Sequence, residues 1–247
     1  DVYKRQTAYH AGLFGKDLFE KVLGVPVSVE LASEFRYREP IVGANDLGIV
    51  ISQSGETMDT IAATELLREN GAHVLALVNV VGSSLARMAD SVFYLHVGPE
   101  IGVASTKAYL GMLVGQLLLA KHWDSANKLD VSFEEIAELP KLIEETMACE
   151  EQIKDISEKI YKKNDIYFIG RGLDYALAAE GALKLKEISY LHAEALAAGE
   201  LKHGTLALIE EGTPIIVTAS QNHLLDKTTS NVQAVSYTHL RAHETDS

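Results

Sequence analysis

The sequence is poor in cysteine, in runs of basic residues and in long apolar stretches. Its single cysteine, Cys149, excludes an internal disulfide and any multi-cysteine metal site, and it fits a reducing compartment. Lys and Arg number 22 against 35 Asp and Glu, and this net charge of −13 argues against nucleic-acid binding. The longest apolar stretch, Leu110–Ala120, is far shorter than the roughly 20 residues that span a bilayer. No signal peptide is recognisable, so we expect a soluble cytoplasmic protein that binds neither nucleic acid nor a membrane.

What is present is the composition of an ordinary globular protein, with 47% hydrophobic and 23% charged residues over 247 positions. Only the two ends, residues 1–6 and 235–247, lack the periodicity of the rest, and we expect them to be non-native. His239 and His243 lie four apart and could share a helical face as metal ligands. Because no third ligand is near in sequence, we expect an unstructured tail and no metal site there.

Short apolar runs alternate with amphipathic stretches along the remaining chain. The runs predict strands at 27–31, 47–51, 73–78, 91–96, 165–169 and 214–219. The stretches between them predict helices at 9–23, 58–69, 84–89, 105–122 and 176–197. This alternation is typical of crossover units, so the sequence predicts an α/β fold with a parallel sheet.

The middle of the chain, residues 126–160, carries no strand signal and mixes glutamates with apolar residues at helical spacing. We interpret it as a helical linker between a first domain, 7–125, and a second domain, 161–234. Cys149 lies in this linker. We expect it to be a buried helix residue rather than a nucleophile, because no His or Asn lies close in sequence.

The second domain resembles a truncated copy of the first. Residues 214–222 repeat the pattern of residues 48–55, a strand followed by a small polar loop and a helix. Residues 166–172, a strand that leads into a helix, would match a strand just upstream of Thr7. We therefore expect one near-complete and one truncated copy of the same α/β unit.

The first candidate site is the hydroxyl-rich loop Ser52–Thr57, which follows a buried strand and opens a helix. Free backbone N–H groups and the positive end of a helix dipole make such a turn an anion site. In parallel sheets, ligands bind beyond the carboxyl ends of the strands, which is where this loop falls. The alternative is a plain capping turn. The three hydroxyls around Gly55 favour a phosphate-binding loop over a plain capping turn.

The second candidate is a charged helix face. Glu180, Lys184 and Glu187 follow the spacing i, i+4 and i+7, so acid, base and acid share one side of a helix. Such charges are usually a solvated face with weak ion pairs. The apolar surroundings in the sequence favour a functional cluster instead, since buried charges have perturbed pKa values more often.

A third candidate, His203, lies between small and flexible residues and could act as an acid–base group or be a structural loop residue. On one continuous helix it would stand about 24 Å from Glu187. Both can serve one small substrate only if Gly199 reverses the chain or a second subunit supplies the histidine, which points to a homodimer. Residues 102–107 open another helix, where Ser105 or Thr106 caps the helix or lines the pocket.

Six segments occur together and in order, and as a set they resemble one family: residues 34–38, 52–57, 82–85, 100–108, 181–195 and 199–206. The sequence is similar to the glutamine–fructose-6-phosphate aminotransferases, or glucosamine-6-phosphate synthases, whose isomerase part is built from two sugar isomerase (SIS) domains. The resemblance covers about residues 7–234. It implies a flavodoxin-like, three-layer α-β-α fold, a homodimer, and no cofactor.

The resemblance also implies roles for particular residues. The sugar phosphate would be held by Thr7, Ser52, Gln53, Ser54 and Thr57, with Val103 and Ser105 beside it. Ala8 stands where some members have a phosphate-contacting serine. Glu187 would move a proton between C2 and C1 of the sugar with Lys184 beside it, and His203 of a neighbouring subunit would assist ring opening.

The family also has parts that this sequence lacks: a glutaminase domain with a nucleophilic cysteine, and a C-terminal tail whose lysine forms a Schiff base with the sugar. We therefore expect the full-length parent to make glucosamine 6-phosphate from fructose 6-phosphate and glutamine-derived ammonia, in UDP-N-acetylglucosamine biosynthesis. The chain alone is expected to bind sugar phosphate weakly or not at all and to have no synthase activity. Two alternatives are another SIS isomerase or deaminase, and a non-enzymatic SIS sensor.

Overall fold

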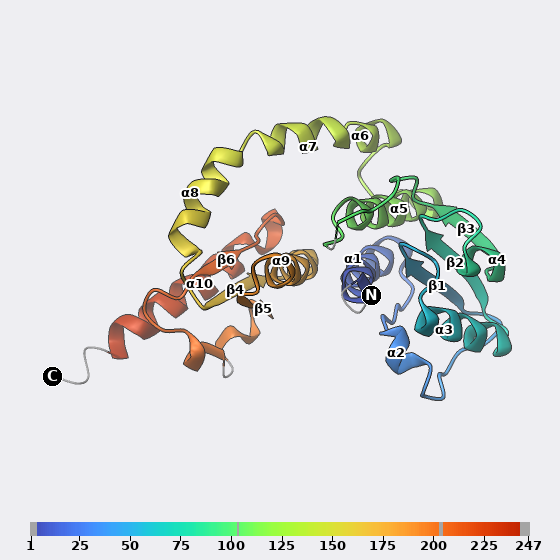
Figure 1. Cartoon of the computed structure of the whole chain (residues 1–247), viewed down its shortest axis with the longest axis horizontal. Coiled ribbons are helices and arrows are strands. Elements are labelled where there is room, and N and C mark those ends of the chain that lie inside the picture. Colours follow the sequence, from blue (N-terminus) through green and yellow to red (C-terminus); the bar gives the residue numbers. More distant parts are fainter. Residues whose placement is uncertain (1–3, 103, 203–204, 243–247) are drawn as a thin grey trace. The chain divides into compact units, whose positions relative to one another are not determined.

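The computed structural model of the chain describes residues 4–102, 104–202 and 205–242. The chain divides into two compact units, with the boundary between Leu129 and Asp130. Each unit has its own three-stranded parallel sheet with helices packed against it (Figure 1). This is the α/β class that the alternation of strands and helices predicts.

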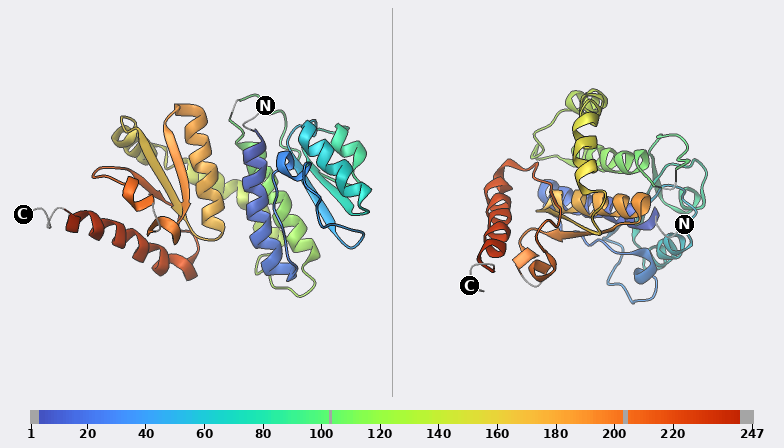
Figure 2. Two further views of the ribbon diagram at one scale, coloured as in Figure 1. Left: turned by 90° about the horizontal axis from the view of Figure 1, so that it is seen from below. Right: turned by 60° about the vertical axis from the view of Figure 1, so that its left-hand side comes forward.

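Unit 1 is a three-layer arrangement around a sheet of order β1-β2-β3. Its elements are α1 (Lys4–Leu23), α2 (Ala32–Phe35), β1 (Leu47–Ser52), α3 (Met58–Glu69), β2 (His73–Val78), α4 (Ser84–Met88), β3 (Ser91–Tyr94) and α5 (Lys107–Trp123). Helices α1 and α5 pack together on one face of the sheet, while α3 and α4 cover the other (Figure 2). Because both faces are covered, the central strand β2 is buried from Val74 to Val78.

Unit 2 begins with helices and continues with a second sheet of order β5-β4-β6. Its elements are α6 (Phe133–Ala137), α7 (Leu139–Met147), α8 (Glu150–Ile160), β4 (Asp165–Gly170), α9 (Leu173–Ser189), β5 (His192–Ala197), the 3-10 turns η1 (Glu200–Lys202) and η2 (Thr205–Leu208), β6 (Ile215–Val217) and α10 (Asn222–Ala242). The apolar core strand is β4, which pairs in parallel with β5 on one side and with β6 on the other.

The strand predicted at 27–31 is wrong, because this segment is extended but pairs with no strand among the described residues. It runs beside α1 instead. The amide of Val27 donates to Glu20 Oε1 over 3.0 Å, and Val29 packs against Gly12. In the described part of unit 1, β1 pairs only with β2, so the segment has no neighbouring strand to provide a ladder.

The helix predicted at 176–197 is also wrong in its last third, residues 190–197. Helix α9 ends at Ser189, Tyr190 takes a left-handed conformation with φ of 61°, and His192–Ala197 forms β5. Pairing with β4 from Asp165 to Gly170 overrides the helical preference of this Ala-rich segment.

The tail and the cysteine differ from the predictions too. Helix α10 continues to Ala242, so a helix occupies much of the segment predicted to be unstructured. The side chain of His239 and all of His243 lie outside the described residues. Cys149 is exposed at the residue before α8, not buried. Within the described residues, no helix is long and apolar enough to cross a membrane.

Candidate functional site

The hydroxyl-rich loop leaves the carboxyl end of β1 and leads into α3. Ser52 is buried, and its Oγ accepts a hydrogen bond of 3.1 Å from the amide of Gly55 and lies 3.4 Å from Thr57 Oγ1. Ser54 Oγ accepts from the Glu56 amide at 3.3 Å. The loop therefore gathers three hydroxyls and several backbone N–H groups at the start of a twelve-residue helix, as an anion site requires.

A second loop, between β2 and α4, supports the first. Gly55 has φ of +67°, and a Cβ there would lie only 2.1 Å from Ser83 Oγ. Glu56 accepts from the amide and the hydroxyl of Ser84, at 2.8 and 2.6 Å. These two hydrogen bonds hold the pKa of Glu56 below its usual value, so the carboxylate stays ionised at the start of α4 and turned away from the hydroxyl loop.

The loop opens onto a cavity of about 820 Å³ that extends between α1, β1 and residues 25–33. Five of the predicted binding residues line this cavity: Ala8, Ser52, Gln53, Ser54 and Thr57. Ala8 comes from α1, 44 positions before the loop, so the fold brings together residues that the sequence keeps apart. No hydroxyl stands at position 8, as the sequence indicates.

The other predicted binding residues are placed differently. Thr7 is fully buried, and it does not line the cavity. Ser105 is 3% exposed and donates to Glu100 Oε2 over 3.3 Å. The same carboxylate oxygen accepts from the Ala108 amide in the first turn of α5. Val103 lies outside the described residues.

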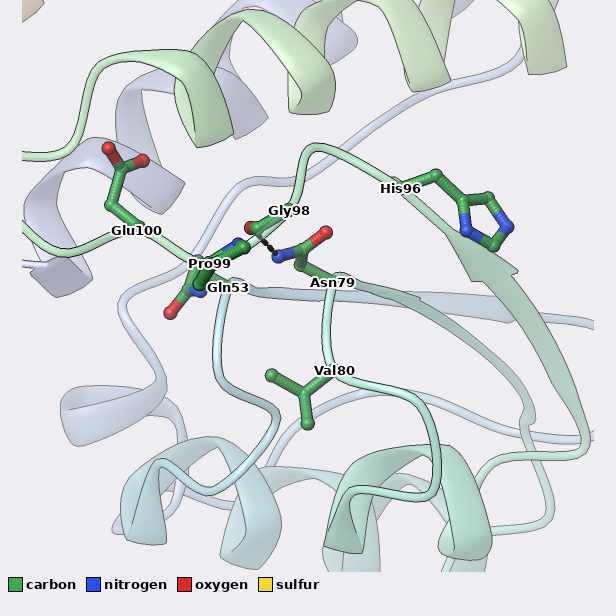
Figure 3. Close-up of a pocket in the computed structure, with 7 residues that line it drawn as sticks. All are labelled: Gln53, Asn79, Val80, His96, Gly98, Pro99 and Glu100. Atoms are coloured by element: carbon green, nitrogen blue, oxygen red, sulfur yellow. Dashed lines mark hydrogen bonds between the residues drawn. The ribbon is translucent and has the colours of Figure 1, made fainter.

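Sequence reasoning missed a second, smaller cavity of about 540 Å³ at the carboxyl ends of β1, β2 and β3. Its lining includes Gln53, Asn79 and His96 (Figure 3). The Asn79 amide donates to the Gly98 carbonyl at 2.7 Å, and its Oδ1 accepts from the Val97 amide at 3.0 Å. Asn79 thereby fixes the loop after β3. Its position directly after the predicted strand 73–78 is the sequence signal that could have identified it.

The charged cluster of unit 2 forms as the helical spacing predicts. Lys184 Nζ lies 2.5 Å from Glu187 Oε2 and 3.3 Å from Glu180 Oε1 on one face of α9. The side chains are 17%, 2% and 6% exposed for Lys184, Glu187 and Glu180. The cluster is therefore buried, unlike the solvated helix face that the sequence left as the alternative. Ion pairs with little access to water interact more strongly than exposed ones.

His203 lies outside the described residues, so the structure does not place it. The spacing of about 24 Å assumed one continuous helix. That assumption is wrong, because α9 ends at Ser189 and the chain then enters β5.

A family model described as "SIS domain" matches residues 2–121 and 159–238. The chain is 53% identical over 235 residues to glutamine–fructose-6-phosphate aminotransferase [isomerizing] of Clostridium tetani. The alignment covers 93% of this chain and 39% of that protein. It is 49% identical over 230 residues to the protein of the same name from Pyrococcus horikoshii, an alignment that covers 92% of this chain and 38% of that protein. The chain thus spans about two fifths of the length of these relatives.

Solved structures give the same picture of the fold. The C-terminal domain of glucosamine-fructose-6-phosphate aminotransferase from Francisella tularensis is 41% identical, with a TM-score of 0.84 over 94% of this chain and 67% of that one. A glucosamine-6-phosphate deaminase from Thermotoga maritima, 22% identical with a TM-score of 0.73, covers 93% of this chain and 70% of that one. At that identity the likeness concerns the fold alone.

Proposed function

Since the chain belongs to the SIS-domain family, we propose that it is the sugar-phosphate isomerase part of a glutamine–fructose-6-phosphate aminotransferase. The observation that carries this proposal is the Ser52–Thr57 loop, which presents its hydroxyls to one end of the cavity that runs along β1. The names of the relatives, which span the same region at about half identity, support fructose 6-phosphate as the substrate.

Unit 1 would hold the phosphate group. Ser52, Ser54 and Thr57 donate hydroxyls, the N-terminus of α3 adds backbone N–H groups, and the helix dipole favours the negative charge. Gln53 and Ala8, which line the same cavity, would complete the surroundings, with Val103 and Ser105 beside the phosphate. Anchoring the phosphate would hold the sugar in one orientation, which lowers the entropy lost on reaching the transition state.

Unit 2 would supply the proton transfer. The Glu187 carboxylate takes the proton from C1 of the ketose and returns it to C2, which converts the ketose into an aldose. Lys184 Nζ lies 2.5 Å from Glu187 Oε2 and would offer positive charge to the enediol-like intermediate. His203 of a neighbouring subunit would assist ring opening, which makes a homodimer part of the proposal.

In the full-length protein the ammonia comes from glutamine, and the product is glucosamine 6-phosphate for UDP-N-acetylglucosamine synthesis in the cytoplasm. Neither a nucleic acid nor a membrane takes part. The isolated chain is expected to bind sugar phosphate weakly and to make no glucosamine 6-phosphate.

The test is Glu187→Gln in the full-length parent. We expect glucosamine 6-phosphate formation to fall at least 100-fold, because the general base is lost, while glutamine hydrolysis continues. Glu194→Gln, an exposed position of β5, is the matched control and keeps both activities. Retention of synthase activity by the Glu187 variant would refute the assignment.

Phosphate binding is tested separately on the isolated chain. Backbone amide resonances of the Ser52–Thr57 loop are followed by NMR as fructose 6-phosphate is added to high millimolar concentration. We expect saturable shifts that disappear in a Ser54→Ala/Thr57→Ala variant and persist in Ser125→Ala, which lies after α5. Unchanged fructose 6-phosphate-induced shifts in the Ser54→Ala/Thr57→Ala variant would contradict the proposed phosphate site.

A further inference from the structure

Unit 2 contains the counterpart of the phosphate loop of unit 1. There β6 ends at Val217, residues 218–221 form a small polar loop, and α10 begins at Asn222. In unit 1, β1, residues 53–57 and α3 follow in the same order. Both loops therefore lie at the carboxyl end of a parallel strand and lead into a long helix, which is the arrangement that binds anions.

The unit 2 loop already holds an anion, the carboxylate of Asp174. Asp174 is 1% exposed, and it accepts hydrogen bonds from four groups. Its Oδ1 accepts from Ser220 Oγ at 2.5 Å, and its Oδ2 accepts from the Ser220 amide at 3.1 Å. The Gln221 amide and Nε2 donate to Oδ2 at 3.4 and 3.2 Å. Two backbone N–H groups, a hydroxyl and a side-chain amide thus surround one buried carboxylate.

The position of Asp174 in the chain explains why this charge is tolerated. The residue lies in the first turn of α9, and its partners precede the first turn of α10, so the carboxylate faces the positive ends of two helix dipoles. Burial raises its pKa, but the hydrogen bonds from Ser220 and Gln221 lower it further than burial raises it. The pKa of Asp174 is therefore below its usual value, and the group is charged at neutral pH.

The loop of unit 1 differs in this respect. Its serine hydroxyls bond to amides of the loop itself, and its one acidic residue, Glu56, turns away to Ser84. The hydroxyl side of this loop lines a cavity of about 820 Å³. The two loops share their place in the fold, but one opens to a cavity and the other is filled by a side chain.

We propose that Asp174 is a built-in anion that occupies the unit 2 counterpart of the phosphate loop, so that a sugar phosphate binds through unit 1 alone. This inference rests on the proposed function for the statement about unit 1, whereas the closure of the unit 2 loop stands on the contacts of Asp174. It makes Asp174 a residue that determines how many phosphate groups the chain accepts.

The experiment removes the carboxylate and offers inorganic phosphate in its place. Amide resonances of Ser220 and Gln221 are followed by NMR during a phosphate titration, with sodium chloride at matched ionic strength as the reference. In the wild type these amides should not move. In Asp174→Ala they should move saturably, and the added substitution Ser220→Ala should weaken that binding at least tenfold.

A thermal measurement covers the case in which Asp174→Ala folds poorly. Phosphate should raise the melting temperature of this variant by about 5 °C or more over the chloride reference, or restore its folding, because a ligand of the native state stabilises it. If a folded Asp174→Ala chain shows no response to phosphate, or if phosphate fails to restore folding, the proposal is overturned. Phosphate-induced shifts of Ser220 in the wild type would also overturn it.

The same titration separates this inference from the proposed function. The amides of Ser54 and Gly55 report on unit 1 in the same spectra. If they stay still while those of Ser220 and Gln221 move in the Asp174 variant, the unit 2 inference holds and the proposed phosphate site of unit 1 fails. If the amides of Ser54 and Gly55 move while those of Ser220 and Gln221 stay still in the Asp174 variant, the phosphate site of unit 1 holds and the unit 2 inference fails.

Discussion

At the scale of single residues, the hydroxyl-rich loop Ser52–Thr57 depends on one glycine. Gly55 combines a left-handed φ of +67° with close contact to Ser83, so a side chain there would be strained and would also collide. The amide of Gly55 donates to Ser52 Oγ, and its carbonyl accepts from the Leu85 amide. Any shift of Gly55 therefore moves the hydroxyl that the proposed site uses.

We predict that Gly55→Ala lowers the free energy of unfolding of unit 1 by about 2–4 kcal/mol and weakens sugar-phosphate binding. Urea unfolding and ligand titration measure the two effects. Gly82→Ala is the matched control: φ there is +69°, yet nothing lies within 4 Å of the added Cβ. It should cost only about 1 kcal/mol, for the backbone strain alone. Equal losses in the two variants would show that contact with Ser83 is unimportant.

The Asp174 carboxylate predicts how the stability of the fold depends on pH. Because its folded pKa lies below the unfolded value of about 3.9, it stabilises the fold fully above pH ~5. That contribution is lost as pH falls through the folded pKa. Asp174→Asn should thus be less stable than the wild type between pH 5 and 7, and the difference should shrink in more acidic solution. Urea unfolding followed by circular dichroism measures it.

The control for that series is Asp155→Asn, at an exposed position of α8. Its stability should stay close to that of the wild type at every pH. A stability difference for the Asp174 variant that is constant down to pH 3 would contradict the ionic role.

At the scale of elements, the turn between α9 and β5 depends on a residue that is unusual for its conformation. Tyr190 ends α9 with φ of 61° and is 92% exposed, so its ring contributes little packing. Glycine is the residue that usually occupies this left-handed position after a helix.

Tyr190→Gly should raise the free energy of unfolding of unit 2 by about 0.5–1 kcal/mol, because it removes the left-handed strain. The comparison is Tyr161→Gly, which ends α8 with φ of −62° and should lower stability instead. Denaturant unfolding of both variants gives the sign. Two changes of the same sign would show that the backbone conformation of Tyr190 carries no strain.

The elements that the sequence predicts correctly are those with strong local signals. The apolar, β-branched runs predict β1, β2 and β4, and the long helical patterns predict α1 and α5. The strand β5 was not, because residues 192–197 favour a helix locally and only pairing with β4 makes them a strand. The error at residues 27–31 is the opposite one: the run favours a strand locally, but no neighbouring strand among the described residues pairs with it.

The candidate site shows the same division. The hydroxyl loop and the Glu180–Lys184–Glu187 face depend on short spacings, so the sequence predicts them well. Asn79 and the carboxylate of Asp174 depend on contacts between segments far apart in the chain. Ser220 lies 46 positions after Asp174, and no local pattern joins them.

At the scale of the whole molecule, the chain consists of two units with separate sheets, and its only tryptophan lies in unit 1. Trp123 ends α5 and packs against Phe19 of α1, with ring centroids 5.8 Å apart. Tryptophan fluorescence therefore reports on unit 1, whereas far-ultraviolet circular dichroism reports on both units.

We predict that the two signals do not give coincident unfolding curves in urea, because each unit has its own core. Asp174→Asn should move the transition seen by circular dichroism and leave the fluorescence transition in place. Gly55→Ala should move the fluorescence transition. If all three proteins show superimposable curves by both signals, the units unfold as one cooperative body.

The exposed cysteine that precedes α8 has a practical consequence. Cys149 is the only thiol of the chain and belongs to unit 2, while the only indole belongs to unit 1. A naphthalene dye attached to that sulfur would put an energy acceptor for Trp123 into unit 2 without any substitution in the protein. The chain thus carries an energy donor in unit 1 and an attachment point for an acceptor in unit 2.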